Sequence, residues 1–207
     1  YNAAVGTSAM QFNANTTGTV QANAALGFEA LEVNANTTGT VTNNTAVGYQ
    51  ALKSASNYTG TIRYNVAVGS NALDVCVPSS NTAVGYNSLT AVTTGASNTA
   101  VGASAGNIST GANNTAIGIL SSGGAVSTGD NNTGLGYATL YEVTSGSNNT
   151  AIGRDAGRAG SPSGSITTGS NIIVLSDDGV ANAHIQVDWT VASDARDKTD
   201  FTALDLG

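Results

Sequence analysis

The sequence contains few of the residues that build most protein cores and most reactive sites. Only 5 % of its 207 residues are aromatic and 9 % are charged, with one cysteine, one methionine, one tryptophan, one histidine and two prolines. A single cysteine excludes an internal disulfide framework. The scarcity of large side chains argues against an ordinary enzyme core, and the lack of Glu, Lys and Leu at heptad spacing excludes a coiled coil.

The charges and the apolar runs exclude further classes of protein. Lys and Arg number six against 13 Asp and Glu, and because nucleic-acid binding needs basic side chains along the phosphates, we expect no nucleic-acid partner. No run of 18 apolar residues occurs, so we expect no membrane insertion. The net charge is −5 over residues 177–207 and −2 over the preceding 176 residues. With no Met start and no signal peptide, we interpret the chain as a piece of a longer protein.

Small and β-branched residues take the place of the missing ones and recur in a regular unit. Gly, Thr, Asn and Ser supply 98 residues, and the unit Asn-Thr-Ala-Val-Gly or a close variant occurs nine times at spacings of 16 to 21 residues. Thr and Val favour strands, whereas Asn and Gly tolerate the left-handed backbone of tight corners. We therefore predict an all-β fold, a parallel β-roll or β-solenoid with 16–21-residue coils stacked about 4.8 Å apart. The unit-ending glycines are Gly6, Gly27, Gly48, Gly69, Gly85, Gly102, Gly118, Gly136 and Gly153.

Alternation of side chains along each strand predicts two rows of opposite orientation. The larger residues, such as Val84 and Val101, form one row, which we expect to fill the inside of the coil. The residues before them are uniformly small, which indicates that another backbone comes close, so we expect this row to face a neighbouring chain. A leucine four positions after the glycine, as in Leu89, is expected in a return strand that packs on the valine row. The predicted trimer-interface residues of the small row are Ala46, Ala83, Ala100, Ala116 and Ala151.

The repeat is similar to those of known surface fibres. Residues 44–52, Asn-Thr-Ala-Val-Gly-Tyr-Gln-Ala-Leu, resemble the repeats of phage tail fibres and the head repeats of YadA-like trimeric adhesins. Those heads are left-handed parallel β-rolls with three chains to a trimer. The resemblance covers residues 1–175 and implies a homotrimeric shaft that binds a host cell-surface receptor, with a glycan as the expected chemistry, and other virion tail proteins.

The C-terminal segment carries a second resemblance. Residues 188–201 are similar to the opening of the endosialidase-type intramolecular chaperone domain of phage tail spikes, which cuts itself off the fibre. The resemblance implies Ser193 as the nucleophile, Lys198 as its base and Ser193–Asp194 as the cleaved bond in the full-length precursor. The alternative is a solvated, charged linker. The predicted division is a shaft over 1–175, a capping strand region over 176–192 and the start of the chaperone over 193–207.

Single aromatic residues suggest further contacts. Tyr49, Tyr86 and Tyr137 each follow a unit glycine and could stack on sugar rings, or equally pack between chains. Segment 184–191 alternates like a strand with one buried face, so we expect Trp189 to plug the end of the solenoid or the trimer axis. Acidic residues do not recur with the repeat, so we predict no metal site and no cofactor.

The preferred interpretation is a structural and adhesive segment of a phage tail fibre or spike, located in the virion and therefore extracellular. It is not an enzyme beyond single-turnover self-cleavage. The runner-up is the head region of a bacterial trimeric autotransporter adhesin, and a depolymerase with paired carboxylates is third. Regular threonine rows also raise an ice-binding hypothesis. The threonines share the orientation of the valine row, which we expect inside the coil, and this argues against the hypothesis. Absence of thermal hysteresis would exclude it.

Overall fold

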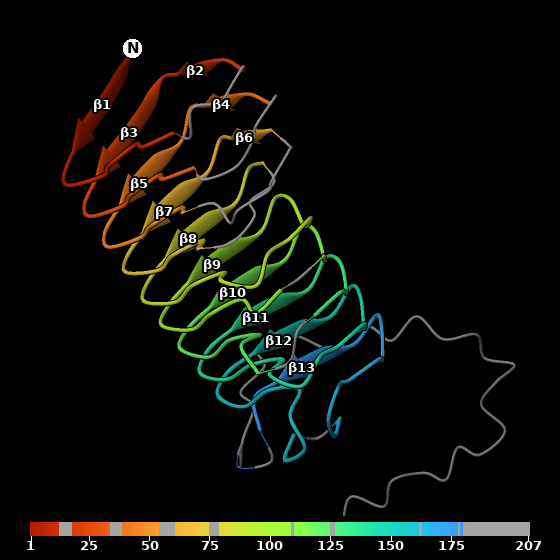
Figure 1. Ribbon diagram of the computed structural model, residues 1–207. Helices are drawn as coiled ribbons and strands as arrows, with labels where there is room; N and C mark the ends of the chain where they lie inside the picture. Colours follow the sequence, from red (N-terminus) through yellow and green to blue (C-terminus); the bar gives the residue numbers. More distant parts are fainter. Residues whose placement is uncertain are drawn as a thin grey trace, which may run out of the picture.

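The computed structural model describes residues 1–12, 18–33, 39–53, 61–74, 79–108, 110–124, 127–161, 163–177 and 179. These residues form a parallel β-solenoid, which confirms the predicted all-β class (Figure 1). Over the same ranges the chain has no helix, and so none long and apolar enough to cross a membrane. Ser193, Lys198 and Trp189 lie outside the described residues, as do Cys76 and His184.

Ten short strands lie side by side in one sheet that runs the length of the rod (Figure 1). All neighbours are parallel and in register, so that equivalent positions of successive repeats face each other, as Ala83 faces Ala100. Paired residues are 21 positions apart from β1 to β7, 16–18 apart from β7 to β12 and 23 apart between β12 and β13. The strands are β1 (Asn2–Val5), β3 (Asn23–Leu26), β5 (Thr45–Val47), β7 (Val66–Val68), β8 (Thr82–Val84), β9 (Thr99–Val101), β10 (Thr115–Ile117), β11 (Thr133–Leu135), β12 (Thr150–Ile152) and β13 (Ile173–Leu175).

The longer early repeats use their extra residues for a second sheet. It contains β2 (Val20–Gln21), β4 (Val41–Thr42) and β6 (Ile62–Arg63), again parallel and in register. Val41 and Ile62 are buried, so this second sheet widens the core of the first coils.

The orientation of the two predicted rows is the reverse of our expectation. Ala46, Ala83, Ala100, Ala116 and Ala151 are fully buried within a single chain, whereas Val101 remains 37 % exposed and Ile117 38 %. The alanines therefore cannot form a trimer interface. They face the interior of the coil, and the larger residues face outward.

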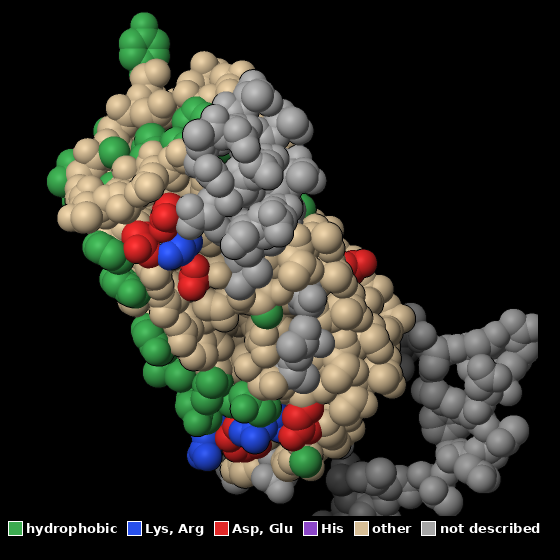
Figure 2. All heavy atoms as spheres, in the orientation of Figure 1, with side chains coloured by type: hydrophobic (Ala, Val, Ile, Leu, Met, Phe, Trp, Pro, Cys, Tyr) green, Lys and Arg blue, Asp and Glu red, His purple; other side chains and the backbone are tan. Residues whose placement is uncertain are grey.

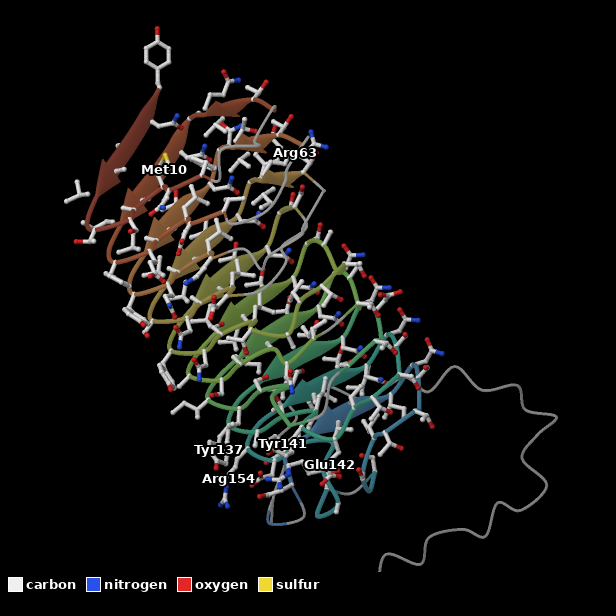
Figure 3. All side chains as sticks on the ribbon, viewed as in Figure 1. Met10, Arg63, Tyr137, Tyr141, Glu142 and Arg154 are labelled. Atoms are coloured by element: carbon white, nitrogen blue, oxygen red, sulfur yellow. The ribbon has the colours of Figure 1, made fainter. Side chains whose placement is uncertain are left out.

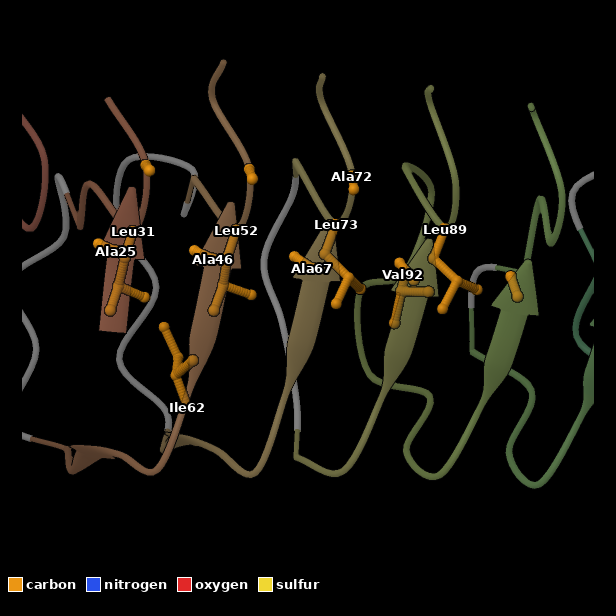
Figure 4. Close-up of a cluster of buried hydrophobic side chains, with 14 of the residues drawn as sticks. Ala25, Leu31, Ala46, Leu52, Ile62, Ala67, Ala72, Leu73, Leu89 and Val92 are labelled. Carbon is orange, nitrogen blue, oxygen red and sulfur yellow. The ribbon is translucent and has the colours of Figure 1, made fainter. Parts of the chain in front are cut away.

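The leucines explain this reversal, and they also occupy a different place from the predicted one. Leu31, Leu52, Leu73 and Leu89 lie in turns with φ between 52° and 55°, not in a return strand. Their side chains are buried against the alanine row, not against the valines (Figure 4). Because the leucine already fills the narrow coil, the facing strand position has room only for a methyl group.

A buried ladder of asparagines runs along the coil. The backbone N–H of Asn98 donates to Asn81 Oδ1 at 2.9 Å, and Asn98 Oδ1 in turn accepts the backbone N–H of Asn114 at 2.9 Å. The Asn98 Nδ2 group donates to the Gly111 carbonyl oxygen at 2.9 Å. Only a neutral side chain with both an acceptor and a donor satisfies these buried backbone groups. The ladder residues are Asn23, Asn44, Asn65, Asn81, Asn98, Asn114, Asn132 and Asn149.

The residue before each ladder asparagine turns the corner. Asn43, Asn113, Asn131 and Asn148 have φ between 57° and 59°, the left-handed region that asparagine tolerates better than most residues. The prediction that Asn supplies left-handed corners is thus confirmed, and in each Asn-Asn pair the first residue forms the corner while the second enters the ladder.

Candidate interaction surfaces

The sheet presents an apolar face to solvent. Its outer apolar row is one side chain per strand and contains no charged residue. The row includes Val101 at 37 %, Leu135 at 45 % and Ile152 at 42 % exposure, so a fully folded chain leaves these groups in water. Figure 2 shows hydrophobic side chains gathered along one edge of the rod between two charged clusters. The outer apolar row is Val5, Leu26, Val47, Val68, Val84, Val101, Ile117, Leu135, Ile152 and Leu175.

An aromatic column lies beside this row, at the position after four of the nine unit glycines: Phe28, Tyr49, Tyr86 and Tyr137. Phe28 and Tyr49 stack with ring centroids 5.5 Å apart and an interplanar angle of 8°. Tyr49, Tyr86 and Tyr137 are 50 %, 57 % and 47 % exposed. They lie on three separate rungs, those of β5, β8 and β11, so the three tyrosines are spread along the axis and do not form one binding site.

The threonine row also faces outward. Thr82, Thr99 and Thr115 pair in register on neighbouring strands and are partly exposed. Their orientation is that of the outer apolar row, as expected, but that side is the outside of the coil. The expectation that the threonines point into the coil, which argued against an ice-binding face, is therefore wrong.

The upper charged cluster lies on the early coils. The Lys53 ammonium forms ion pairs with Glu29 and with Glu32, the latter at 3.2 Å, and Gln50 donates to the Glu29 carboxylate at 2.8 Å. The hydrogen bond from Lys53 lowers the pKa of Glu29, and the same bond raises the pKa of Lys53. This network links two coils by their side chains.

Asp74 lies near this cluster, and its carboxyl is hard to ionise. Burial raises the pKa of Asp74 from 3.8 to about 6, with Glu29 adding to the rise and Lys53 opposing it. The folded state therefore holds this proton more tightly than the unfolded state. The contribution of the protonated Asp74 carboxyl to the stability of the fold is full below about pH 4 and is lost as the pH rises through about 6.

Replacing Asp74 with Asn should consequently stabilise the fold at about pH 7 and change its stability little at about pH 4. At about pH 7 the folded wild type holds an ionised carboxyl in a partly buried site, whereas Asn carries no charge there. Urea unfolding midpoints of the wild type and the variant at both pH values provide the measurement. An identical difference between the two proteins at both pH values would contradict the assignment.

The lower charged cluster forms a pocket at the other end of the rod, which we call the terminal pocket. It has a volume of about 320 Å³ and is lined by Glu142, Arg154, Asp155, Arg158, Ala159, Gly160 and Asp177. Figure 3 shows Tyr137, Tyr141, Glu142 and Arg154 together at this end, with Arg63 at the opposite end. Sequence reasoning did not select this pocket, although Arg154, Asp155 and Arg158 form a local cluster of charge in a charge-poor shaft.

Asp155 organises the terminal pocket. One carboxylate oxygen accepts a hydrogen bond from Arg158 Nη1 at 2.7 Å, and the other forms an ion pair with Arg154 Nε at 3.0 Å. The Arg158 guanidinium also lies 4.8 Å from the centre of the Tyr141 ring, within range of a cation–π interaction. The pocket thus presents two oriented guanidinium groups beside carboxylates.

Comparison with family models, curated proteins and solved structures gives no match. Over the ranges that the structure describes, no three His, Cys, Asp or Glu side chains are grouped so that they could hold a metal ion.

Proposed function

We propose that this chain is a rod-forming, adhesive segment of a phage tail fibre or spike, which associates with two further copies of itself and attaches to a host-cell receptor. The observation that carries the proposal is the outward apolar face of the solenoid. The number three, the virion location and the self-cleaved chaperone at Ser193 and Lys198 come from the sequence resemblances.

The size of the exposed face supports association. Ten strands separated by about 4.8 Å give a length of about 43 Å, and a three-residue strand with its adjoining turn residue gives a width of about 13 Å. The resulting area of about 560 Å² lies at the upper end of the range for the largest apolar patch of a typical monomer. It is about 70 % of the roughly 800 Å² that each partner contributes to a standard protein interface.

The chemistry of the face favours a second copy of the chain as its partner. Charged residues are depleted at the centre of protein interfaces, and neither the outer apolar row nor the threonine row contains one. The face also repeats its side chains once per strand spacing over its whole length. A parallel second copy offers the same repeat and can match every rung.

Light scattering after size exclusion tests the proposed assembly. The wild-type chain should have a mass near 61 kDa, three times its 20.4 kDa, and Val101→Asp should shift it toward a single chain because a charge would be buried in the interface. Thr94→Asp, at an exposed bend outside the sheet, adds the same charge and should leave the mass unchanged. A stable wild-type monomer would contradict the proposal.

The alternative within the same kind of assembly is the head of a bacterial trimeric adhesin. A full-length protein with a chaperone domain after the shaft would favour the fibre, and one with a coiled-coil stalk would favour the adhesin.

A second candidate function follows from the outward threonine row. Five successive strands from β8 to β12 present Thr beside Val, Ile or Leu, an array that could order water against ice. Thermal hysteresis combined with a monomeric mass would favour ice binding over the fibre.

A further inference from the structure

We propose that the terminal pocket binds a neutral saccharide, one or two sugar rings in size. This inference rests on the proposed attachment function and gives it a location and a ligand class. It differs from the predicted glycan contacts in that Tyr49 and Tyr86 play no part.

The terminal pocket is one of two places where the shaft concentrates its few charges. The first 176 residues carry ten charged side chains, and four of them line the terminal pocket: Glu142, Arg154, Asp155 and Arg158. Arg154 takes the position that Tyr137 holds one rung earlier, and the residues at the other eight positions after a unit glycine are uncharged. The upper charged cluster has one cation, Lys53, paired with two carboxylates, whereas in the terminal pocket two arginines share the single carboxylate of Asp155.

The guanidinium groups are held ready for a ligand. Asp155 contacts Arg154 through Nε and Arg158 through Nη1, and each guanidinium has five N–H donors in a fixed plane. The Arg154 side chain is 73 % exposed, so its outer edge faces solvent at the pocket. Asp155 thus orients both guanidinium groups and leaves several of their N–H donors available to a ligand.

The mixture of donors and acceptors fits sugar hydroxyls. A hydroxyl both donates and accepts, so it can accept from Arg154 while it donates to the carboxylate of Asp177 or Glu142. Three acids and two arginines give the lining a net charge of −1, which disfavours a phosphate or another strong anion. The exposed Tyr137 ring beside the pocket offers an apolar face for a pyranose ring.

The dimensions agree with this ligand class. A cavity of about 320 Å³ lies at the lower end of the range for small-molecule sites, about 300–1,000 Å³. It is large enough for a short saccharide and too small for a long segment of polymer, which would have to leave the pocket along the surface.

Saturation-transfer NMR on the full chain tests the inference. The probes are glucose, galactose, N-acetylglucosamine, lactose and maltose as neutral sugars, with N-acetylneuraminic acid as an anionic one. At least one neutral probe should bind, and Arg154→Ala and Tyr137→Ala should each weaken that binding, Arg154→Ala by about tenfold or more because a charge-assisted hydrogen bond is lost. Arg63→Ala, an exposed arginine at the opposite end, and Tyr49→Ala should leave it unchanged.

The outcomes separate this inference from the proposed assembly. Binding of the anionic probe alone, no binding of any neutral probe, or binding that Arg154→Ala leaves intact would overturn the saccharide site. The mass of the same sample is measured in parallel. A trimer without saccharide binding would contradict only the pocket, whereas a monomer that binds a neutral sugar would support the pocket and contradict the assembly.

Discussion

Replacing Asn114 with alanine should destabilise the folded chain by about 2–5 kcal/mol, because it leaves buried backbone groups without partners. The Asn114 side chain accepts the backbone N–H of Asn132 at 2.8 Å and donates to the Gly129 carbonyl oxygen at 2.9 Å. Alanine can do neither, and Asn114 is only 3 % exposed, so water cannot readily replace the lost partners. The urea midpoint followed by circular dichroism measures the loss.

The neighbouring residue provides the matched control. Asn113 is exposed and occupies the left-handed corner with φ of 59°, a conformation that glycine adopts without strain. Asn113→Gly should therefore change the free energy of unfolding by no more than about 0.5 kcal/mol. Equal effects of Asn113→Gly and Asn114→Ala would show that the ladder has no special role.

The second large effect is expected for Gly102→Ala, with a loss of about 3–5 kcal/mol. The φ angle of Gly102 is +135°, which side chains rarely adopt, and a Cβ atom there would lie 2.6 Å from the Gly118 carbonyl oxygen and 2.7 Å from its carbon. The obstacle is the backbone of the next coil, so the chain cannot relieve the clash by moving a side chain. The stacking distance itself would have to change.

Gly164→Ala separates the clash from the backbone strain. Gly164 also has a positive φ, +67°, but a Cβ atom there would meet nothing within 4 Å. This variant should lose only about 1–2 kcal/mol, the ordinary penalty of a left-handed conformation. If Gly102→Ala lost no more than Gly164→Ala, the close approach of successive coils would not be a determinant of the fold.

Periodicity alone was sufficient to predict the fold class. The regular spacing of the glycines indicated stacked coils, and the same positions pair in register in the structure. The left-handed corners followed from the chemistry of Asn. The longer spacing of the early repeats corresponds to an added strand in each of those coils, since Val41 and Ile62 pair in a second sheet.

The orientation of the rows could not be obtained in this way. Alternation shows which residues share a face of a strand, but it does not show which face is inside. Hydropathy favoured Val101 over Ala100 for the interior, and this was wrong because the buried leucines, such as Leu89, leave little space across the coil. A Cβ at Gly106 would lie 2.7 Å from Leu89 Cδ2 and 2.9 Å from Ala100 Cβ, which shows how completely these groups fill the interior.

The interaction sites were predicted less well than the fold, for a related reason. The tyrosines were selected because they follow the repeat, and a repeated residue is spread along the axis instead of gathered at one point. The terminal pocket is built where the repeat is interrupted, by Arg154, Asp155 and Arg158 in the long last coil. Its formation depends on how that coil brings Arg158 onto the Tyr141 ring. The spacing of the repeat units does not specify such a contact.

Chemical cross-linking between copies tests the account most directly. In a Cys76→Ser background, Val101→Cys places one thiol on the outer apolar row, and Thr94→Cys places one on the exposed bend outside the sheet. A short bifunctional thiol reagent should join Val101→Cys chains into covalent dimers and leave Thr94→Cys chains single. Single chains from Val101→Cys, or dimers formed only through Thr94→Cys, would contradict association through the outward face.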